Sequence, residues 1–140
     1  ALEAIDGRAA DAARAAMARL GPGASPRERL RTAIVGSLPT DARTREQALL
    51  FFSFYVAGIT DRSLGSADAL ASPRWTVPWT ASVLREGSLR AGVDPDREAL
   101  LLMMEYAGLS LALLAGQVEE SDAIGAVDAH LDRIFRPRRP

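Results

Sequence analysis

The chain has 140 residues, of which 48% are hydrophobic and 25% are charged, and its formal net charge is −1. This length fits one domain with a sizeable core, and the charge gives no basic excess with which to hold nucleic acid. Cysteine is absent and histidine occurs once, which excludes disulfides and metal sites built from thiolates or several imidazoles of one chain. No apolar run reaches the roughly 20 residues of a membrane span and no signal peptide is visible, so we expect a cytoplasmic protein without a cofactor.

The N-terminal segment, residues 1–20, is rich in alanine and has high helix propensity from its first residue. It begins with neither a methionine nor an N-cap residue, so we expect the chain to be part of a longer polypeptide. A Gly-Pro-Gly sequence ends this helix. Ser25 and Glu28 then form a capping box with Pro26 at the first helical position, which predicts a second helix that ends near Leu38.

The third predicted helix, Ala42–Ile59, follows the N-cap candidate Asp41. It carries so many large apolar side chains that we expect it to lie centrally in the fold. A connection of small and polar residues, 63–71, separates it from a fourth helix. Serine and proline begin that helix, which is predicted over 72–91 with Gly92 as its stop.

The last two predicted helices, 96–115 and 121–135, carry more apolar surface than one small domain can bury. The first of them is apolar on both faces, with Leu100, Met104 and Leu111 on one face and Leu102, Leu109 and Leu113 on the other. A helix that is apolar all round must be buried all round, so a second copy of the chain is expected to cover part of it. No segment alternates with period two, and the chain is predicted to be an all-α bundle of about six helices.

The order of these elements resembles the C-terminal regulatory domain of the tetracycline-repressor (TetR) family of transcriptional regulators. The resemblance covers nearly the whole chain, and its most specific part is Gly108–Leu114 followed by Ala126–Leu131. The family often has aspartate before that glycine, where this chain has Ala107. The resemblance implies a single regulatory domain over residues 1–140, with the DNA-binding helix-turn-helix upstream and absent from this chain. Residues 1–20 would then connect the DNA-binding head to the body.

The resemblance also implies three partners. The last two helices of each subunit would form an intersubunit four-helix bundle in a homodimer. A small-molecule effector would bind in a pocket among the middle helices, and operator DNA would be bound only through the missing head. The function implied is that of a transcriptional regulator, expected to be a repressor, whose effector changes DNA binding by its differential affinity for two states.

The candidate effector residues are aromatic or acidic side chains on the third, fourth and fifth helices. Large rings with a few polar anchors are typical of such pockets. Core packing is the alternative role for each ring, and for Glu105 it is an ion pair with an arginine such as Arg85 or Arg90, because an unpaired carboxylate in an apolar helix is costly. The candidates are Phe51, Phe54, Tyr55, Trp75, Trp79, Glu105 and Tyr106.

The candidate dimer residues are mostly small side chains that let two helices approach closely. Periodicity does not decide which apolar face turns toward the partner, so residues of both helices are retained. No catalytic residue is predicted, because His130 stands without a clustered nucleophile, and an all-α enzyme is disfavoured. A stand-alone dimeric helical binding or scaffold protein is the alternative to the regulator. The dimer candidates are Ala107, Gly108, Leu111, Ala123, Ala126, Val127 and His130.

Overall fold

The structure is a computed structural model that describes residues 11, 14–61, 63 and 72–137, with the backbone alone for 72–75. Helical residues 14–19 end the first segment, and the helices that follow confirm the all-α prediction. In the part of the chain that is described, no helix is long and apolar enough to cross a membrane. The helices are α2 (Pro26–Ser37), α3 (Ala42–Thr60), α4 (Ser72–Arg85), α5 (Pro95–Leu114) and α6 (Glu120–Ile134).

The helix starts lie where the capping residues predict them. The Ser25 hydroxyl accepts a hydrogen bond from the Glu28 amide at 3.2 Å, and the Glu28 carboxylate accepts one from the Ser25 amide at 2.7 Å. Asp41 caps α3 in the same way, and Asp94 caps α5 by accepting from the backbone amide of Asp96. These contacts satisfy amides that have no partner inside the helix, and they join residues only a few positions apart. Local sequence therefore fixes where these helices begin.

The end of α4 differs from the prediction, because the helix stops at Arg85 and does not continue to residue 91. Gly87 lies so close to the Phe135 ring that a Cβ on this glycine would be 2.5 Å from the ring Cε1 atom. Next to this contact, Leu89 forms an isolated antiparallel bridge with Phe135. The segment after α4 is thus held by the C-terminal end of α6 and cannot remain helical.

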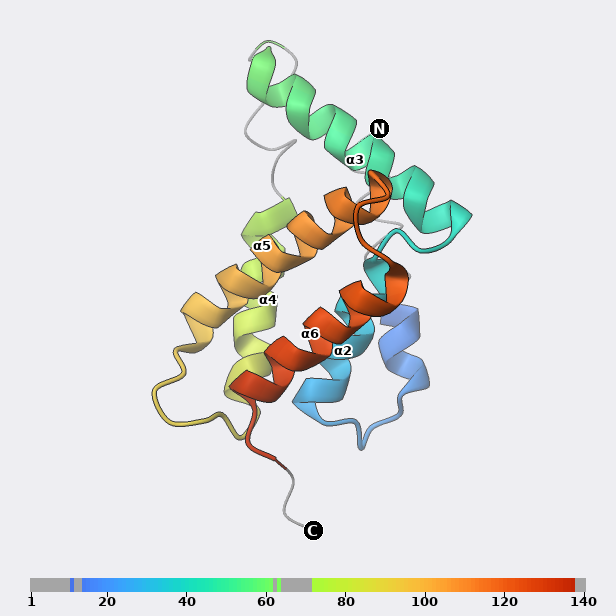
Figure 1. Cartoon of the computed structure of the whole chain (residues 1–140). Coiled ribbons are helices and arrows are strands. Elements are labelled where there is room, and N and C mark those ends of the chain that lie inside the picture. The colour runs from blue at the N-terminus through green and yellow to red at the C-terminus, as the bar shows by residue number, and fades with distance from the viewer. Residues whose placement is uncertain (1–10, 12–13, 62, 64–71, 138–140) are drawn as a thin grey trace.

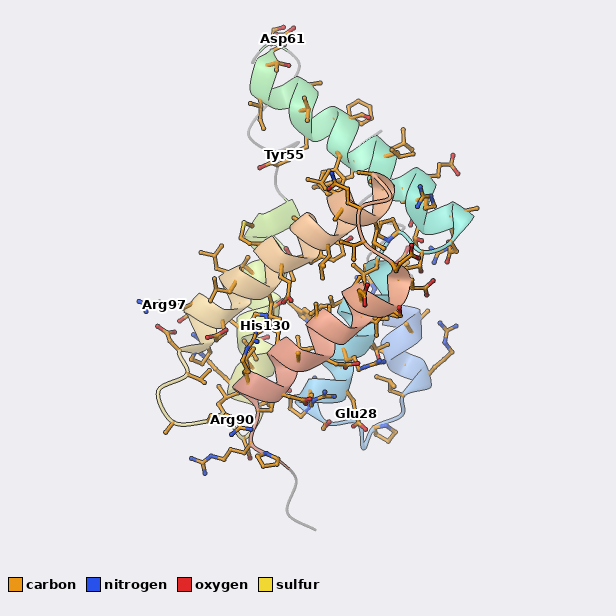
Figure 2. The ribbon with its side chains drawn as sticks, in the orientation of Figure 1. Glu28, Tyr55, Asp61, Arg90, Arg97 and His130 are labelled. Atoms are coloured by element: carbon orange, nitrogen blue, oxygen red, sulfur yellow. The ribbon has the colours of Figure 1, made fainter. Side chains whose placement is uncertain are left out.

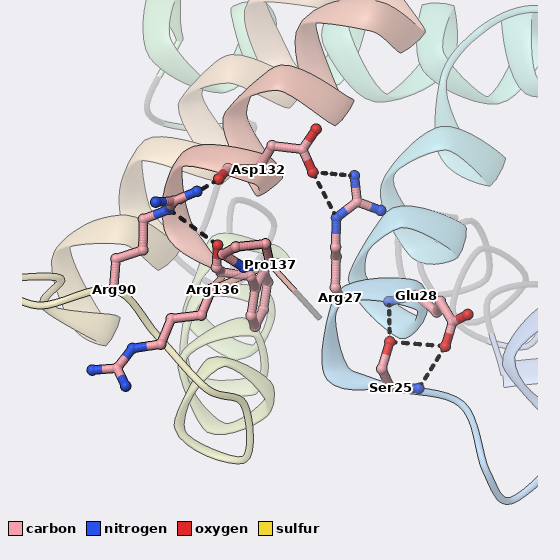
Figure 3. A pocket seen from close by; sticks show the side chains of 8 residues that line it. Ser25, Arg27, Glu28, Arg90, Asp132, Arg136 and Pro137 are labelled. Carbon is pink, nitrogen blue, oxygen red and sulfur yellow. Dashed lines mark hydrogen bonds and ion pairs between the residues drawn. The ribbon is translucent and has the colours of Figure 1, made fainter. Parts of the chain in front are cut away.

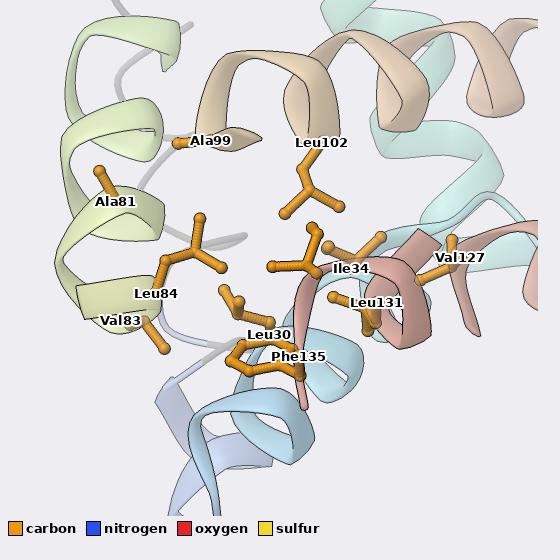
Figure 4. Packing of buried hydrophobic residues seen from close by; sticks show 11 residues of the cluster. Leu30, Ile34, Ala81, Val83, Leu84, Ala99, Leu102, Val127, Leu131 and Phe135 are labelled. Atoms are coloured by element: carbon orange, nitrogen blue, oxygen red, sulfur yellow. The ribbon is translucent and has the colours of Figure 1, made fainter. Parts of the chain in front are cut away.

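The core lies between α2, α4, α5 and α6. Figure 1 shows α5 and α6 side by side, with α2 and α4 behind them. The close view in Figure 4 shows the buried side chains that fill the space between these helices. A smaller cluster of Leu38, Leu113 and Ala123 continues the core at the other end of α6, and Tyr106 and Leu109 contact both clusters. The main cluster includes Leu30, Ile34, Leu84, Leu102, Val127, Leu131 and Phe135.

The central position predicted for α3 is wrong. Its buried residues are Thr44 and Ala48, both in its first half, and its second half extends away from the bundle in Figure 1. Side-chain exposure reaches 57% at Val56 and 60% at Ile59. The first half of α3 meets α5, where the Arg45 guanidinium donates to the Leu113 carbonyl at 3.4 Å. Apolar composition did not distinguish a helix buried in the bundle from one attached at one end.

Candidate functional site

The aromatic candidates of α3 lie on the protruding half of that helix. Phe51 and Tyr55 stack with ring centroids 6.0 Å apart, and Phe51 meets Phe52 edge to face at 5.4 Å. Phe54 and Tyr55 are exposed, at 41% and 37%. The structure therefore brings Phe51 and Tyr55 together, but as a surface cluster on one helix.

Tyr106 and Trp79 lie deeper, because both pack against the main core cluster. The Tyr106 hydroxyl donates a hydrogen bond to the Ser37 carbonyl at 3.2 Å, which connects α5 to the end of α2. Burial raises the pKa of the Tyr106 hydroxyl above its usual value, so this group remains a neutral donor at physiological pH. The side chain of Trp75 lies outside the described residues.

Glu105 pairs with a histidine and not with Arg85 or Arg90. Its carboxylate contacts the Nδ1 atom of His130, and the Nε2 atom of the same ring lies 3.1 Å from the Glu98 carboxylate. Arg85 instead binds Asp96 at 2.6 Å, and Arg90 donates to backbone carbonyls at the end of α6. The prediction named the wrong partner: Arg85 ends α4 and Arg90 follows it, and both bind other groups, whereas Glu105 faces α6.

One face of α5 remains exposed although it is strongly apolar. Four large side chains on this face are 48–53% exposed, and Gly108 lies among them. The opposite face, with Ala99, Leu102, Ser110 and Leu113, is buried in the protomer. The structure thereby decides which face of α5 turns inward. The exposed side chains are Leu100, Leu101, Met104 and Leu111.

The exposed face of α6 lies beside that of α5 and is made of small or polar residues. Gly125 and Ala129, one turn apart, are exposed, whereas Ala123 and Val127 are fully buried in the core. Ala123 and Val127 therefore have no surface that a partner subunit could contact, in contrast to their prediction as dimer residues. The remaining dimer candidates lie differently: Gly108 and Leu111 are exposed, and Ala107, Ala126 and His130 are half-buried.

The exposed residues of this two-helix face that were not among the dimer candidates are Leu100, Leu101, Met104, Gly125 and Ala129, although Leu100 and Met104 had been placed on an apolar face of α5. The pattern on α6 contained the necessary signal. Ala123, Val127 and Leu131 repeat every four residues on the buried face, and Gly125 and Ala129 repeat in the same way on the opposite side. Small size alone was the wrong criterion, because small residues occupy both faces.

Ion pairs join α2 to α6 along the edge of α6 that adjoins α2, and Asp132 of this edge is itself exposed. The Arg31 guanidinium binds Asp128 through two bonds of 2.6 and 3.0 Å, and Arg27 donates to Asp132 at 2.7 Å. Hydrogen bonding from Arg31 lowers the pKa of the Asp128 carboxyl, and the same contact raises the pKa of Arg31. Paired guanidinium and carboxylate groups of this kind fix the orientation of α6 on α2.

An open cleft of about 510 Å³ lies where α2 begins and α6 ends, as Figure 3 shows. Figure 2 places Glu28 and Arg90 at this end of the molecule, opposite Tyr55 and Asp61. Arg90 donates through Nε to the carbonyls of Asp132 and Phe135 at 3.2 and 3.1 Å, and Glu28 is used in the capping box. No sequence pattern predicted this cleft, because its three segments are far apart along the chain. Its polar groups mainly bind one another and hold this end of the bundle together.

The described residues contain no group of three or more acidic or histidine side chains arranged to hold a metal ion. What the arrangement offers is packing surface: an exposed two-helix face on α5 and α6, and a set of aromatic side chains on α3, α4 and α5. Both features present apolar area of the kind that becomes buried when a partner or a ligand binds.

Comparisons with known proteins agree with this arrangement. Residues 26–136 match the model of a family described as BetI-type transcriptional repressor, C-terminal. The fold is similar to the crystal structure of a putative TetR-family transcriptional regulator from Rhodococcus sp., with a TM-score of 0.80 and 22% identity. That match covers 96% of this chain and 71% of the other. A comparison with curated protein sequences finds no significant match.

Proposed function

Because the chain belongs to the TetR family of transcriptional regulators, as its C-terminal domain, we propose that it is the dimerising and effector-sensing part of a repressor. Two copies associate through the exposed faces of α5 and α6. A small molecule bound among α3, α4 and α5 changes how the subunits hold an N-terminal DNA-binding head. The observation that carries the proposal is the exposed apolar face of α5 beside the small residues of α6.

Dimerisation is supported by the chemistry of this face. Leu101, Met104 and Leu111 are each about half exposed, and together they form an apolar stripe along α5. Soluble monomers rarely leave such a contiguous stripe in water, and a stripe of this kind marks an association surface. Gly125 and Ala129 on α6 allow the backbone of a partner helix to approach closely, so that the two helices of each copy can form one bundle.

Effector binding is supported by the aromatic side chains that α3, α4 and α5 carry. Tyr106 supplies a neutral hydroxyl at the boundary of both core clusters, and Trp79 packs against the main cluster. Phe51, Phe54 and Tyr55 lie on the half of α3 that has few contacts, so this half can close over a ligand without breaking the core. Trp75, one helical turn before Trp79, is assigned to the same site from its position on α4.

The association is tested by light scattering at micromolar concentration. We expect the wild-type chain to be a dimer and the Met104→Glu variant to be a monomer, because a charge in the middle of the apolar stripe would be desolvated without a partner. Val56→Glu on α3 is the matched control, since Val56 is similarly exposed but lies outside this face. A dimer that survives Met104→Glu and dissociates with Val56→Glu would place the interface on α3.

The sensing role is tested with a library of small aromatic compounds, using the fluorescence of Trp75 and Trp79 and the melting temperature of the chain. Both tryptophans are on α4, so a ligand at the proposed site changes the emission directly. We expect at least one compound to raise the melting temperature, and Tyr106→Phe to weaken its binding by loss of one hydrogen bond, about 1 kcal/mol. Ligands that bind equally well to a Trp79→Leu, Tyr106→Phe double variant would favour the scaffold alternative.

A further inference from the structure

His130, the single histidine of the chain, is held between two carboxylates of the neighbouring helix. Its Nε2 atom lies 3.1 Å from a Glu98 oxygen, and its Nδ1 atom contacts a Glu105 oxygen. The two glutamates are seven residues apart on α5, which places them two turns apart along the edge that faces α6. Figure 2 shows His130 between the α5 and α6 ribbons.

This geometry depends on the protonation state of the imidazole. A neutral imidazole has one N–H and one lone pair, so it can donate to only one of two carboxylates. The second carboxylate then faces the lone pair of the other ring nitrogen, and these two electron-rich groups repel each other. An imidazolium has two N–H groups and donates to both glutamates at once. Contacts of both ring nitrogens with carboxylate oxygens can therefore both be hydrogen bonds only when the ring carries the second proton.

The three side chains are poorly hydrated even in the single protomer. His130 is 12% exposed, and Glu98 and Glu105 are 22% and 23% exposed. They lie where the exposed face of α5 adjoins that of α6: Leu101 is between the two glutamates in sequence, and Ala129 precedes the histidine. A second copy seated on these faces would remove more of the remaining water. The cost of the negative charge would then rise, and a proton on the imidazole would offset part of it.

We propose that Glu98, His130 and Glu105 form a protonation-dependent clamp under the dimer face, so that binding of a proton by His130 strengthens the dimer. The proposal rests on the proposed dimer and adds a regulation to it. With the proton, the clamp holds α5 and α6 in the register that presents a continuous apolar face. Without it, one glutamate loses its partner and the two helices are pushed apart at the seam.

Other charged groups near α6 do not take the place of these contacts. On α2, the helix packed on the other side of α6, Arg27 binds Asp132 and Arg31 binds Asp128. On α4, Arg85 binds Asp96. Within the described part of the chain, Glu98 and Glu105 are the charged groups that contact the imidazole.

The test is the dimer dissociation constant of the 140-residue chain, measured by analytical ultracentrifugation at about pH 6 and about pH 8, the interval in which histidine changes charge in proteins. We expect the dimer to be about tenfold weaker at the higher pH, because protons are released when the subunits separate. The Glu105→Gln variant should remain a dimer and lose this dependence, since an amide can accept from or donate to a neutral ring. Glu46→Gln, on an exposed part of α3, is the matched control and should behave as wild type.

The possible results separate the two proposals. A dimer of equal strength at both pH values overturns the clamp and leaves the dimer face in place. Equal pH dependence in wild type and in Glu105→Gln also overturns the clamp, because another group would then carry the proton. A chain that is monomeric at both pH values overturns the dimer face itself, and the clamp with it.

Discussion

The α3 and α5 helices have similarly apolar sequences but different places in the molecule. α5 buries one full face against α2, α4 and α6 and leaves the other face exposed beside α6. α3 buries only Thr44 and Ala48 and extends from the bundle. Apolar character therefore indicates that a helix needs a partner, but it does not say which partner covers each face.

The largest difference in the free energy of unfolding is expected between alanine variants of two leucines, one on each of these helices. Leu102 is 1% exposed in the core on α5, and Leu49 is 53% exposed on α3. We expect Leu102→Ala to lower the free energy of unfolding by about 3 kcal/mol, because it removes apolar contacts and leaves a cavity. Leu49→Ala should cost less than about 0.5 kcal/mol. Urea unfolding followed by circular dichroism measures both, and equal losses would mean that α3 packs as tightly as α5.

A smaller effect is expected where α4 ends against Phe135. Gly87→Ala would place a Cβ 2.5 Å from the Phe135 ring and should cost about 2 kcal/mol, because the ring must shift in a packed core. Gly36→Ala on α2 is the control, since a Cβ there meets nothing within 4 Å. The control should stabilise the helix by about 0.5 kcal/mol or more. Thermal unfolding of the two variants should shift in opposite directions; shifts in the same direction would contradict the contact.

The ion pair of Arg31 with Asp128, between α2 and α6, should contribute less to the free energy of unfolding, and this contribution should depend on pH. Arg31 lowers the pKa of Asp128 in the folded state, so the pair stabilises the fold above the usual carboxyl range and is lost as the pH falls through the folded-state pKa. Asp128→Asn should therefore cost about 1 kcal/mol at neutral pH and almost nothing in strong acid. Glu46→Gln on α3 should change nothing at either pH. The comparison is made by urea unfolding at both pH values, and a cost for Asp128→Asn that persists in acid would show that the charge is not its source.

The sequence predicted the starts of α2 and α3 well, because each depends on contacts within one turn. Ser25 with Glu28, and Asp41 with Thr44, are such contacts. The end of α4 depends on a contact with Phe135, which lies far along the chain. The predicted end of this helix, at residue 91, was therefore wrong. The position of α3 was also wrong, because periodicity describes a helix face without naming what covers it.

The candidate site was predicted in part. The sequence predicted that α5 carries an association surface, and the structure shows which of its two apolar faces is exposed. Ala123 and Val127 were assigned to the seam by their size, although they fill the core. The partner of Glu105 was missed because His130 is 25 residues away, and only the packing of α5 on α6 brings the two together.

The most direct test of the dimer face uses the absence of cysteine from the chain, which allows a single cysteine to report one position. Ala129→Cys places a thiol on the exposed face of α6, and Ser53→Cys places one on the exposed surface of α3. Disulfide formation needs Cα atoms within about 7 Å of each other. Under mild oxidation we expect the Ala129→Cys chain to form covalent dimers rapidly and the Ser53→Cys chain to remain uncrosslinked. Rapid cross-linking through position 53, with none through position 129, would contradict a dimer built on α5 and α6.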